Sequence, residues 1–328
     1  MTNSIQNLLS YCSDIEFGPV DISAAECDFY QNFNDEIISL CRSLPESIQI
    51  EAINFCMKYS GIAFGKELNF FKHFYTPTWS ILYWLNESSR QFRNLTRSDI
   101  EHAITIHALA MFLHSLDDHL NDGEIPATHL ILLIRSQAWM TMNHAIEYFC
   151  SQLTDGAKRA QKFLDAYYGA ISKSYETGVL DTYCDLFKKQ MSIGLIAPVL
   201  LMSRMAASQN FTDDMITAYC AFGIAWRLLD DIKDIKIDMA KSIHSAVYVC
   251  LPRKMQHSWN QLKLTDLNQA EEKTTTVLNC IKNKNIIGCL KERICHELEI
   301  AASIADRHDM PNFAGEFRSL LKPLLSDE

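Results

Sequence analysis

The chain has 328 residues, of which 48% are apolar, so it is long enough to bury a large hydrophobic core. Its formal net charge of −10 argues against a nucleic-acid partner, because binding to phosphate backbones requires a basic surface. The eleven cysteines are scattered and include no Cys-x-x-Cys pair, which favours reduced thiols over a disulfide framework or a zinc site.

The N-terminal residues, Met1 to Gln6, have neither the basic nor the apolar region of a signal peptide. The longest apolar run, Ile193 to Met202, is shorter than the roughly 20 residues that a membrane span needs. We therefore expect a cytoplasmic protein without a transmembrane segment. Chain termini are often poorly ordered, and we expect the first ~20 residues to be flexible.

Helical periodicity predominates along the chain, whereas alternating strand patterns, linkers and repeats are absent. The segment 98–120 opens with a predicted capping box, Ser98-x-x-Glu101, and is apolar on nearly every face, as is typical of a buried helix. The sequence predicts a single all-α domain over residues 1–328, with about ten to twelve helices. Helices are predicted at 24–43, 46–60, 67–92, 98–120, 127–153, 156–179, 182–208, 212–240, 266–282, 285–307 and 312–325.

Two acidic clusters lie at the ends of two of these apolar helices. The first comprises Asp117, Asp118, Asn121 and Asp122. The second follows the apolar segment 221–229 and forms one helical stripe with basic ends: Arg227, Asp230, Asp234, Asp238 and Lys241.

Like charges four residues apart on a helix repel by a few tenths of a kcal/mol per pair. A solvated face with intrahelical ion pairs is the ordinary interpretation of such a stripe. Two observations favour a bound cation instead: the stripe follows an apolar segment that is expected to be buried, and a second acidic cluster is present. Buried carboxylates are costly without a cation. Magnesium prefers oxygen ligands and binds through one or two carboxylates together with substrate phosphates. The two clusters therefore predict a magnesium site for a diphosphate.

The segment 230–241, with its Asp-Asp-x-x-Asp pattern, resembles the second aspartate-rich motif of the trans-isoprenyl diphosphate synthases. The segment 117–122 resembles the first such motif, which is shared with the class I terpene cyclases. The resemblance extends weakly over residues 50–325, and it implies an isoprenoid-synthase-type helical bundle around a central cavity, three Mg²⁺ per active site and a homodimer. It implies these metal ligands: Asp117, Asp118, Asn121, Asp122, Asp230, Asp231, Asp234 and Asp238.

The same resemblance assigns residues to the substrate. Arg227, Lys241 and one of Lys188 or Lys189 would contact the diphosphate, while Gln190 stands where the synthases usually carry a lysine. Aromatic rings near the metals could stabilise an allylic cation by roughly 0.5–2 kcal/mol each. We expect this of Phe112 and Trp226, each within about two helical turns of an acidic cluster.

Two departures from the synthases bear on the reaction. Their Gly-Gly-Lys-Arg-x-Arg-Pro-type segment is replaced at 65–77 by a largely aromatic stretch, and their arginines after the first motif are replaced by Gly123-Glu124-Ile125-Pro126. A site for a second diphosphate is therefore not expected. We predict a class I terpene synthase, a lyase that ionises an allylic prenyl diphosphate with Mg²⁺.

Two alternatives stay open at this point. The first is a prenyltransferase, either an isoprenyl diphosphate synthase or an enzyme of the head-to-head or non-isoprenoid acceptor type. The second is a catalytically silent subunit that partners an active synthase. The histidines near the first cluster, His107, His114 and His119, lack zinc-site spacing and are expected to be satisfied core or rim residues.

Overall fold

The structure is a computed structural model that describes residues 3–63, 65–92, 95–173, 178–262 and 267–325. Within these ranges the chain forms helices and no strand, so the prediction of an all-α fold is confirmed. The helices are α1 (Asn3–Asp14), α2 (Ala24–Arg42), α3 (Glu46–Tyr59), α4 (Pro77–Phe92), α5 (Arg97–Asn121), α6 (His129–Gln152), α7 (Gly156–Tyr168), α8 (Leu180–Gln190), the 3-10 helix η1 (Ser192–Leu195), α9 (Ile196–Arg204), α10 (Gln209–Lys233), α11 (Ile235–Lys241), α12 (Ala246–Cys250), α13 (Arg253–Gln261), α14 (Leu267–Asn283), α15 (Ile286–Arg307) and α16 (Pro311–Leu325).

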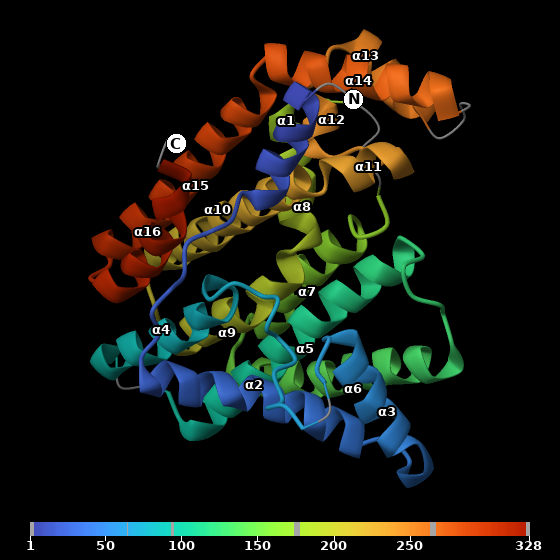
Figure 1. Ribbon diagram of the computed structural model, residues 1–328. Coiled ribbons are helices and arrows are strands. Elements are labelled where there is room, and N and C mark those ends of the chain that lie inside the picture. Colours follow the sequence, from blue (N-terminus) through green and yellow to red (C-terminus); the bar gives the residue numbers. More distant parts are fainter. Residues whose placement is uncertain (1–2, 64, 93–94, 174–177, 263–266, 326–328) are drawn as a thin grey trace.

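Two long helices, α5 and α10, form the interior of the bundle (Figure 1). Helix α5 packs against α2, α6 and α9, and α10 packs against α15 along its length. Both helices are apolar on most faces, which is the pattern expected of helices surrounded by others. Because each carries an acidic cluster at its C-terminal end, the packing of these two helices positions the candidate site.

The described residues contain sixteen α-helices, more than the ten to twelve predicted, because two predicted helices are broken and α1, α12 and α13 lie outside the predicted ranges. The predicted helix 182–208 is interrupted by η1. Pro198 cannot donate a main-chain hydrogen bond, and its ring would clash with the carbonyl of Gly194 in a continuous helix. A new helix, α9, therefore begins at Ile196 and accommodates Pro198 in its first turn.

Other boundaries also differ from prediction. Helix α4 begins at Pro77 rather than at residue 67, since proline suits the first turn of a helix. Helix α7 ends at Tyr168 rather than at residue 179, and the predicted helix 212–240 breaks at Asp234. Residues 3–14 form α1, which packs on α10 and α14 and buries Cys12, and the flexibility of the N-terminal segment stays a prediction.

The capping box of α5 lies two residues before its predicted position. The Thr96 hydroxyl accepts a hydrogen bond from the Asp99 main-chain N–H at 3.2 Å, and the Asp99 carboxylate accepts one from the Thr96 N–H at 2.7 Å. Asp99 is fully buried and also contacts Arg204 Nε at 3.2 Å. The sequence contains two overlapping capping-box patterns, which begin at Thr96 and at Ser98. The buried ion pair of Asp99 with Arg204 favours the first.

All eleven cysteines are free thiols. Among the described residues, no single helix is long and apolar enough to cross a membrane; α8 together with η1 and α9 meets the length and composition criteria only as a pair bent by 57°.

A buried carboxyl group joins α16 to α4. Glu316 accepts hydrogen bonds from Ser80 Oγ and Trp84 Nε1, both at 2.5 Å. Burial raises the pKa of Glu316 to about 8, and the nearby Glu26 of α2 raises it further. The folded protein therefore keeps a proton on Glu316 at pH values where the unfolded chain has released it.

We expect the free energy of unfolding to fall as the pH rises from about 4.5 towards 8, because the folded-state pKa of Glu316 is raised. Glu316→Gln keeps an acceptor for Ser80 and Trp84 without a titratable proton, so it should flatten this pH dependence. Urea unfolding at several pH values measures the effect. Glu101→Gln, which removes an exposed ion pair with Arg97, is the matched control. Equal pH slopes in the wild type and Glu316→Gln would contradict the prediction.

Candidate active site

The two acidic clusters lie at the C-terminal ends of α5 and α10. Carboxylates are disfavoured at this end of a helix, where the main-chain carbonyl groups place partial negative charge. Asp118 of α5 is close enough to Asp230 of α10 to raise the pKa of Asp230. The clusters therefore face each other, and their combined charge is unfavourable without a cation.

Asp117 is bound within the protein. Its carboxylate forms an ion pair with the Arg135 guanidinium of α6, whose Nε and terminal nitrogen both donate to it, the latter at 3.0 Å. The Tyr167 hydroxyl of α7 donates to the same carboxylate at 2.9 Å. The Asp117 side chain is only 5% exposed. These contacts already satisfy the carboxylate, and the metal-ligand role of Asp117 stays a prediction.

The neighbouring face of α5 presents Asp118 and, one turn later, Asp122. The Asp118 carboxylate is half-buried and has no hydrogen-bond or ion-pair partner in the described part of the chain. Partial burial raises the pKa of Asp122, and the charges of Asp118 and Glu124 raise it further. Asn121 donates from Nδ2 to the Ile171 carbonyl at 3.3 Å. The acids of this cluster that are available for a ligand are therefore Asp118 and Asp122. This pair begins one position after Asp117, where the sequence motif begins.

Asp231 in the second cluster resembles Asp117 in its environment. It accepts hydrogen bonds from the Tyr183 hydroxyl at 2.5 Å and from the Ala246 main-chain N–H at 2.8 Å. Its second oxygen lies 3.1 Å from Arg227 Nε. The side chain is 1% exposed. Asp231 therefore joins α8, α10 and α12, and its role as a metal ligand stays a prediction.

The remaining acids of the second cluster, Asp230, Asp234 and Asp238, follow one another at helical-turn spacing. Burial raises the pKa of Asp230 to about 6; Arg227 opposes this shift, and Asp231 and Asp234 add to it. Burial, together with the charge of Asp231, raises the pKa of Asp238 to about 7. Asp238 is buried, whereas Asp230 and Asp234 are partly exposed, and the three negative charges repel one another along this stripe.

Two of the predicted cationic residues lie at the clusters. Arg227 Nε donates to the Tyr183 hydroxyl at 2.9 Å, and its Nη1 lies 3.9 Å from Asp230. Lys241 Nζ lies 3.0 Å from Glu124 Oε1. Because Lys241 is on α11 and Glu124 follows α5, this exposed ion pair connects the two sides of the site.

The α8 residues that were predicted to contact the substrate make other contacts in the structure. Lys188 pairs with Asp185 at 3.0 Å, and its charge interacts with Cys220 and Glu297 rather than with the acidic clusters. The Gln190 amide donates to the main-chain carbonyls that follow α7. Lys189 is exposed, and no contact among the described residues joins it to either cluster. None of these three side chains fits the predicted diphosphate contact in this conformation.

An apolar cavity lies directly below the two clusters. His114, one turn before Asp118, and Trp226, one turn before Asp230, both line it. Its volume is about 30 Å³, whereas ligand pockets usually measure about 300–1,000 Å³. The other lining residues are Phe74, Thr78, Ala110, Met111, Met191, Ile193, Gly194, Tyr219, Phe222 and Gly223.

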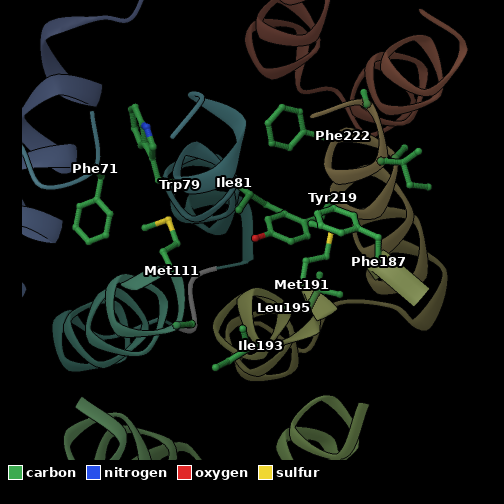
Figure 2. Close-up of a cluster of buried hydrophobic side chains, with 14 of the residues drawn as sticks. Phe71, Trp79, Ile81, Met111, Phe187, Met191, Ile193, Leu195, Tyr219 and Phe222 are labelled. Carbon is green, nitrogen blue, oxygen red and sulfur yellow. The ribbon is translucent and has the colours of Figure 1, made fainter. Parts of the chain in front are cut away.

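Two side chains fill the space that a substrate tail would need (Figure 2). A Cβ atom at Gly223 would lie 2.1 Å from Met191 Sδ, and a Cβ atom at Gly194 would lie 2.3 Å from the Tyr219 hydroxyl. Met191 and Tyr219 therefore pack against glycine main chain across the cavity. The cavity is central, as the sequence predicted, but it is nearly filled.

The two predicted aromatic residues lie in different places. Trp226 is half-buried at the cavity wall, with its ring centroid 6.1 Å from that of Phe187. Phe112 does not line this cavity; its ring packs edge-on against Tyr59 of α3, with centroids 6.3 Å apart. The adjacent residue Met111 occupies the wall instead. One residue along a helix turns a side chain by about 100°, which places Met111 rather than Phe112 at this cavity, and the role of Phe112 stays a prediction.

Sequence reasoning did not identify Arg135 or the roles of Tyr167 and Tyr183. Arg135 lies 18 residues from Asp117, and Tyr167 lies 50 residues from it. Neither distance corresponds to a local motif. The tertiary packing of α6 and α7 on α5 brings them together, so a single sequence carries no signal for these contacts.

The chemistry of the available acids fits magnesium. No group of three His, Cys, Asp or Glu residues among the described residues forms a complete metal site. Magnesium commonly binds through one or two carboxylates, with water and substrate phosphates as further ligands. Burial, together with the charges of neighbouring aspartates, raises the pKa values of Asp230 and Asp238, and a bound cation would favour their charged forms.

No family model and no curated protein matches the sequence. Solved structures do match. Geranylgeranyl pyrophosphate synthase from Corynebacterium glutamicum is 13% identical with a TM-score of 0.64, and the match covers 98% of this chain and 100% of that one. Polyprenyl synthetase from Streptomyces coelicolor is 11% identical with a TM-score of 0.68, over 93% and 100% of the chains. Farnesyl diphosphate synthase from T. brucei is 13% identical with a TM-score of 0.59, over 92% and 100%.

The chain has the class I isoprenoid synthase fold. The predicted fold resemblance is thereby confirmed over nearly the whole chain. Within this isoprenoid synthase fold, two acids of the predicted motifs, Asp117 and Asp231, are used to hold helices together. The acids left available for a ligand are Asp118, Asp122, Asp230, Asp234 and Asp238.

We expect Asp117→Asn and Asp118→Asn to affect stability in opposite ways. Asp117→Asn removes the buried partner of Arg135 and should lower the free energy of unfolding by about 3 kcal/mol. Asp118→Asn relieves repulsion with Asp230, so it should leave stability unchanged or raise it. Urea unfolding at pH 7 measures both. A similar loss of stability in the two variants would be inconsistent with the different environments of these adjacent acids.

Proposed function

We propose that this protein is a magnesium-dependent enzyme that ionises an allylic prenyl diphosphate. The observation that supports this most is the position of Asp118 and Asp230, two partly desolvated carboxylates on different helices, directly above an apolar cavity. Such an arrangement suits a ligand with an anionic head, bound through cations, and an apolar tail. The isoprenoid synthase fold supports the same interpretation.

In the proposed reaction the bond between the allylic carbon and the diphosphate oxygen breaks, and its electron pair leaves with the diphosphate. Asp118, Asp122, Asp230, Asp234 and Asp238 would hold magnesium, which neutralises the charge that develops on the leaving group. Arg227 lies beside Asp230 and would contact the diphosphate. Trp226 at the cavity wall would stabilise the cation through its π-face.

Transfer of the prenyl cation to an acceptor is the reaction that the comparisons favour, since the similar structures are named as diphosphate synthases. The terpene synthase expected from the sequence is the second candidate. It is favoured by the segment 65–77, which contains no arginine and whose Lys72 donates to the Gly61 carbonyl at 2.7 Å. An acceptor without a diphosphate would reconcile both observations.

The test is incubation with allylic diphosphates of several chain lengths and Mg²⁺, with and without isopentenyl diphosphate. We expect diphosphate release that is lost on chelation of the metal. Asp118→Asn and Asp230→Asn should lower this release by roughly 100-fold, because each removes charge that holds the ion over the leaving group. Asp213→Asn, at an exposed position near the start of α10, is the matched control.

The products distinguish the candidates. Product that forms only with an added acceptor indicates prenyl transfer, and hydrocarbon or alcohol from one substrate indicates a terpene synthase. If no allylic diphosphate releases diphosphate in the presence of Mg²⁺, the proposal is wrong and the silent-subunit alternative gains support.

The nearly filled cavity predicts a preference for short prenyl chains. Met191→Ala removes a side chain that crosses the cavity, so it should shift the ratio of kcat/KM values towards longer diphosphates. Met202→Ala is the matched control, because Met202 is fully buried in α9 but does not line the cavity. Both changes should cost about 2–5 kcal/mol of stability. An unchanged chain-length preference in Met191→Ala alone would show that Met191 does not limit the tail.

A further inference from the structure

One histidine at the cavity wall has an unused nitrogen. His114 Nδ1 is buried and has no hydrogen-bond partner among the described residues. The main chain of Gln190 lies close enough to raise the pKa of the imidazole. In the neutral tautomer with the proton on Nε2, Nδ1 carries a free lone pair. The sequence had predicted a satisfied histidine here.

The surroundings of His114 keep the imidazole neutral. Burial lowers its pKa, and the charge of Arg227 acts in the same direction, against the opposing charges of Asp118 and Asp117. Tyr167 packs nearby, with ring centroids 6.4 Å apart. Among the residues that line the cavity, His114 is the one whose side chain presents a basic lone pair at neutral pH.

We propose that His114 is the base that accepts the proton when the carbocation in this cavity is converted to product. This inference rests on the proposed function. His114 lies one helical turn below Asp118, so it faces the tail side of the site rather than the diphosphate side. It is therefore placed to reach hydrogens on carbons next to a cation held between the clusters and the cavity.

In this step a C–H bond adjacent to the cationic carbon breaks, and its electron pair forms the new carbon–carbon double bond. The proton passes to His114 Nδ1, which gives an imidazolium ion beside the main chain of Gln190. The imidazolium returns the proton to the departing diphosphate or to water when the products leave. No oxidant or further reactant is required.

The test is His114→Gln, whose amide keeps a polar side chain at this position but has no basic nitrogen. We expect the amount of alkene formed per diphosphate released to fall by roughly 100-fold, the range of a positioned general base, with alcohol from water capture in its place. His107→Gln is the matched control. His107 Nδ1 is likewise buried and unpartnered, and Nε2 contacts the Thr78 carbonyl at 2.7 Å, but this residue does not line the cavity.

A readout without substrate accompanies this assay. The nitrogen-resolved NMR spectrum of the histidines, assigned by the loss of signals in His114→Gln, should show His114 protonated on Nε2 and unprotonated on Nδ1 at pH 7. A proton on Nδ1, or an unchanged alkene yield per diphosphate in His114→Gln, would overturn the assignment of the base while leaving ionisation intact. A wild-type protein that releases no diphosphate would instead overturn the proposed function, and the base with it.

Discussion

The repulsion between carboxylates at the C-terminal ends of α5 and α10 is the constraint on which the rest of the site depends. Asp118, Asp230 and Asp238 are partly desolvated, and at least two of them carry raised pKa values because of burial and their neighbours. A fold that gathers such groups without a cation loses stability. Arg227 offsets only part of this charge. The arrangement therefore makes sense as a binding surface for divalent cations and an anionic ligand.

The same helices need fixed positions despite this repulsion. The contacts of Asp117 with Arg135 and Tyr167 help to fix these positions. The contacts of Asp231 with Arg227 and Tyr183 do the same. Each of these buried acids is directly adjacent in sequence to an acid that stays available for a ligand. Adjacent aspartates thus divide two tasks, since consecutive residues on a helix point about 100° apart.

Below the charged rim, the cavity couples packing to chemistry. Glycines at 194 and 223 let Tyr219 and Met191 reach across it, and the remaining space is about 30 Å³. A polar group interacts more strongly in such an apolar environment than it does in water. The wall thereby combines a limit on tail length with a buried nitrogen that has no hydrogen-bond partner among the described residues, His114 Nδ1.

The sequence by itself determined the helical class, the burial of the helices that carry the acids, and the presence of two acidic clusters, because 3.6-residue periodicity and clustered charge are local properties. The break at Pro198 follows from local chemistry as well, although the pattern of apolar residues concealed it. Only the tertiary structure decided which acids are available, since the partners of Asp117 lie 18 and 50 residues away along the chain. It also decided that Met111, not Phe112, faces the cavity and that His114 Nδ1 has no hydrogen-bond partner among the described residues, because side-chain direction and contacts between distant helices are set by packing.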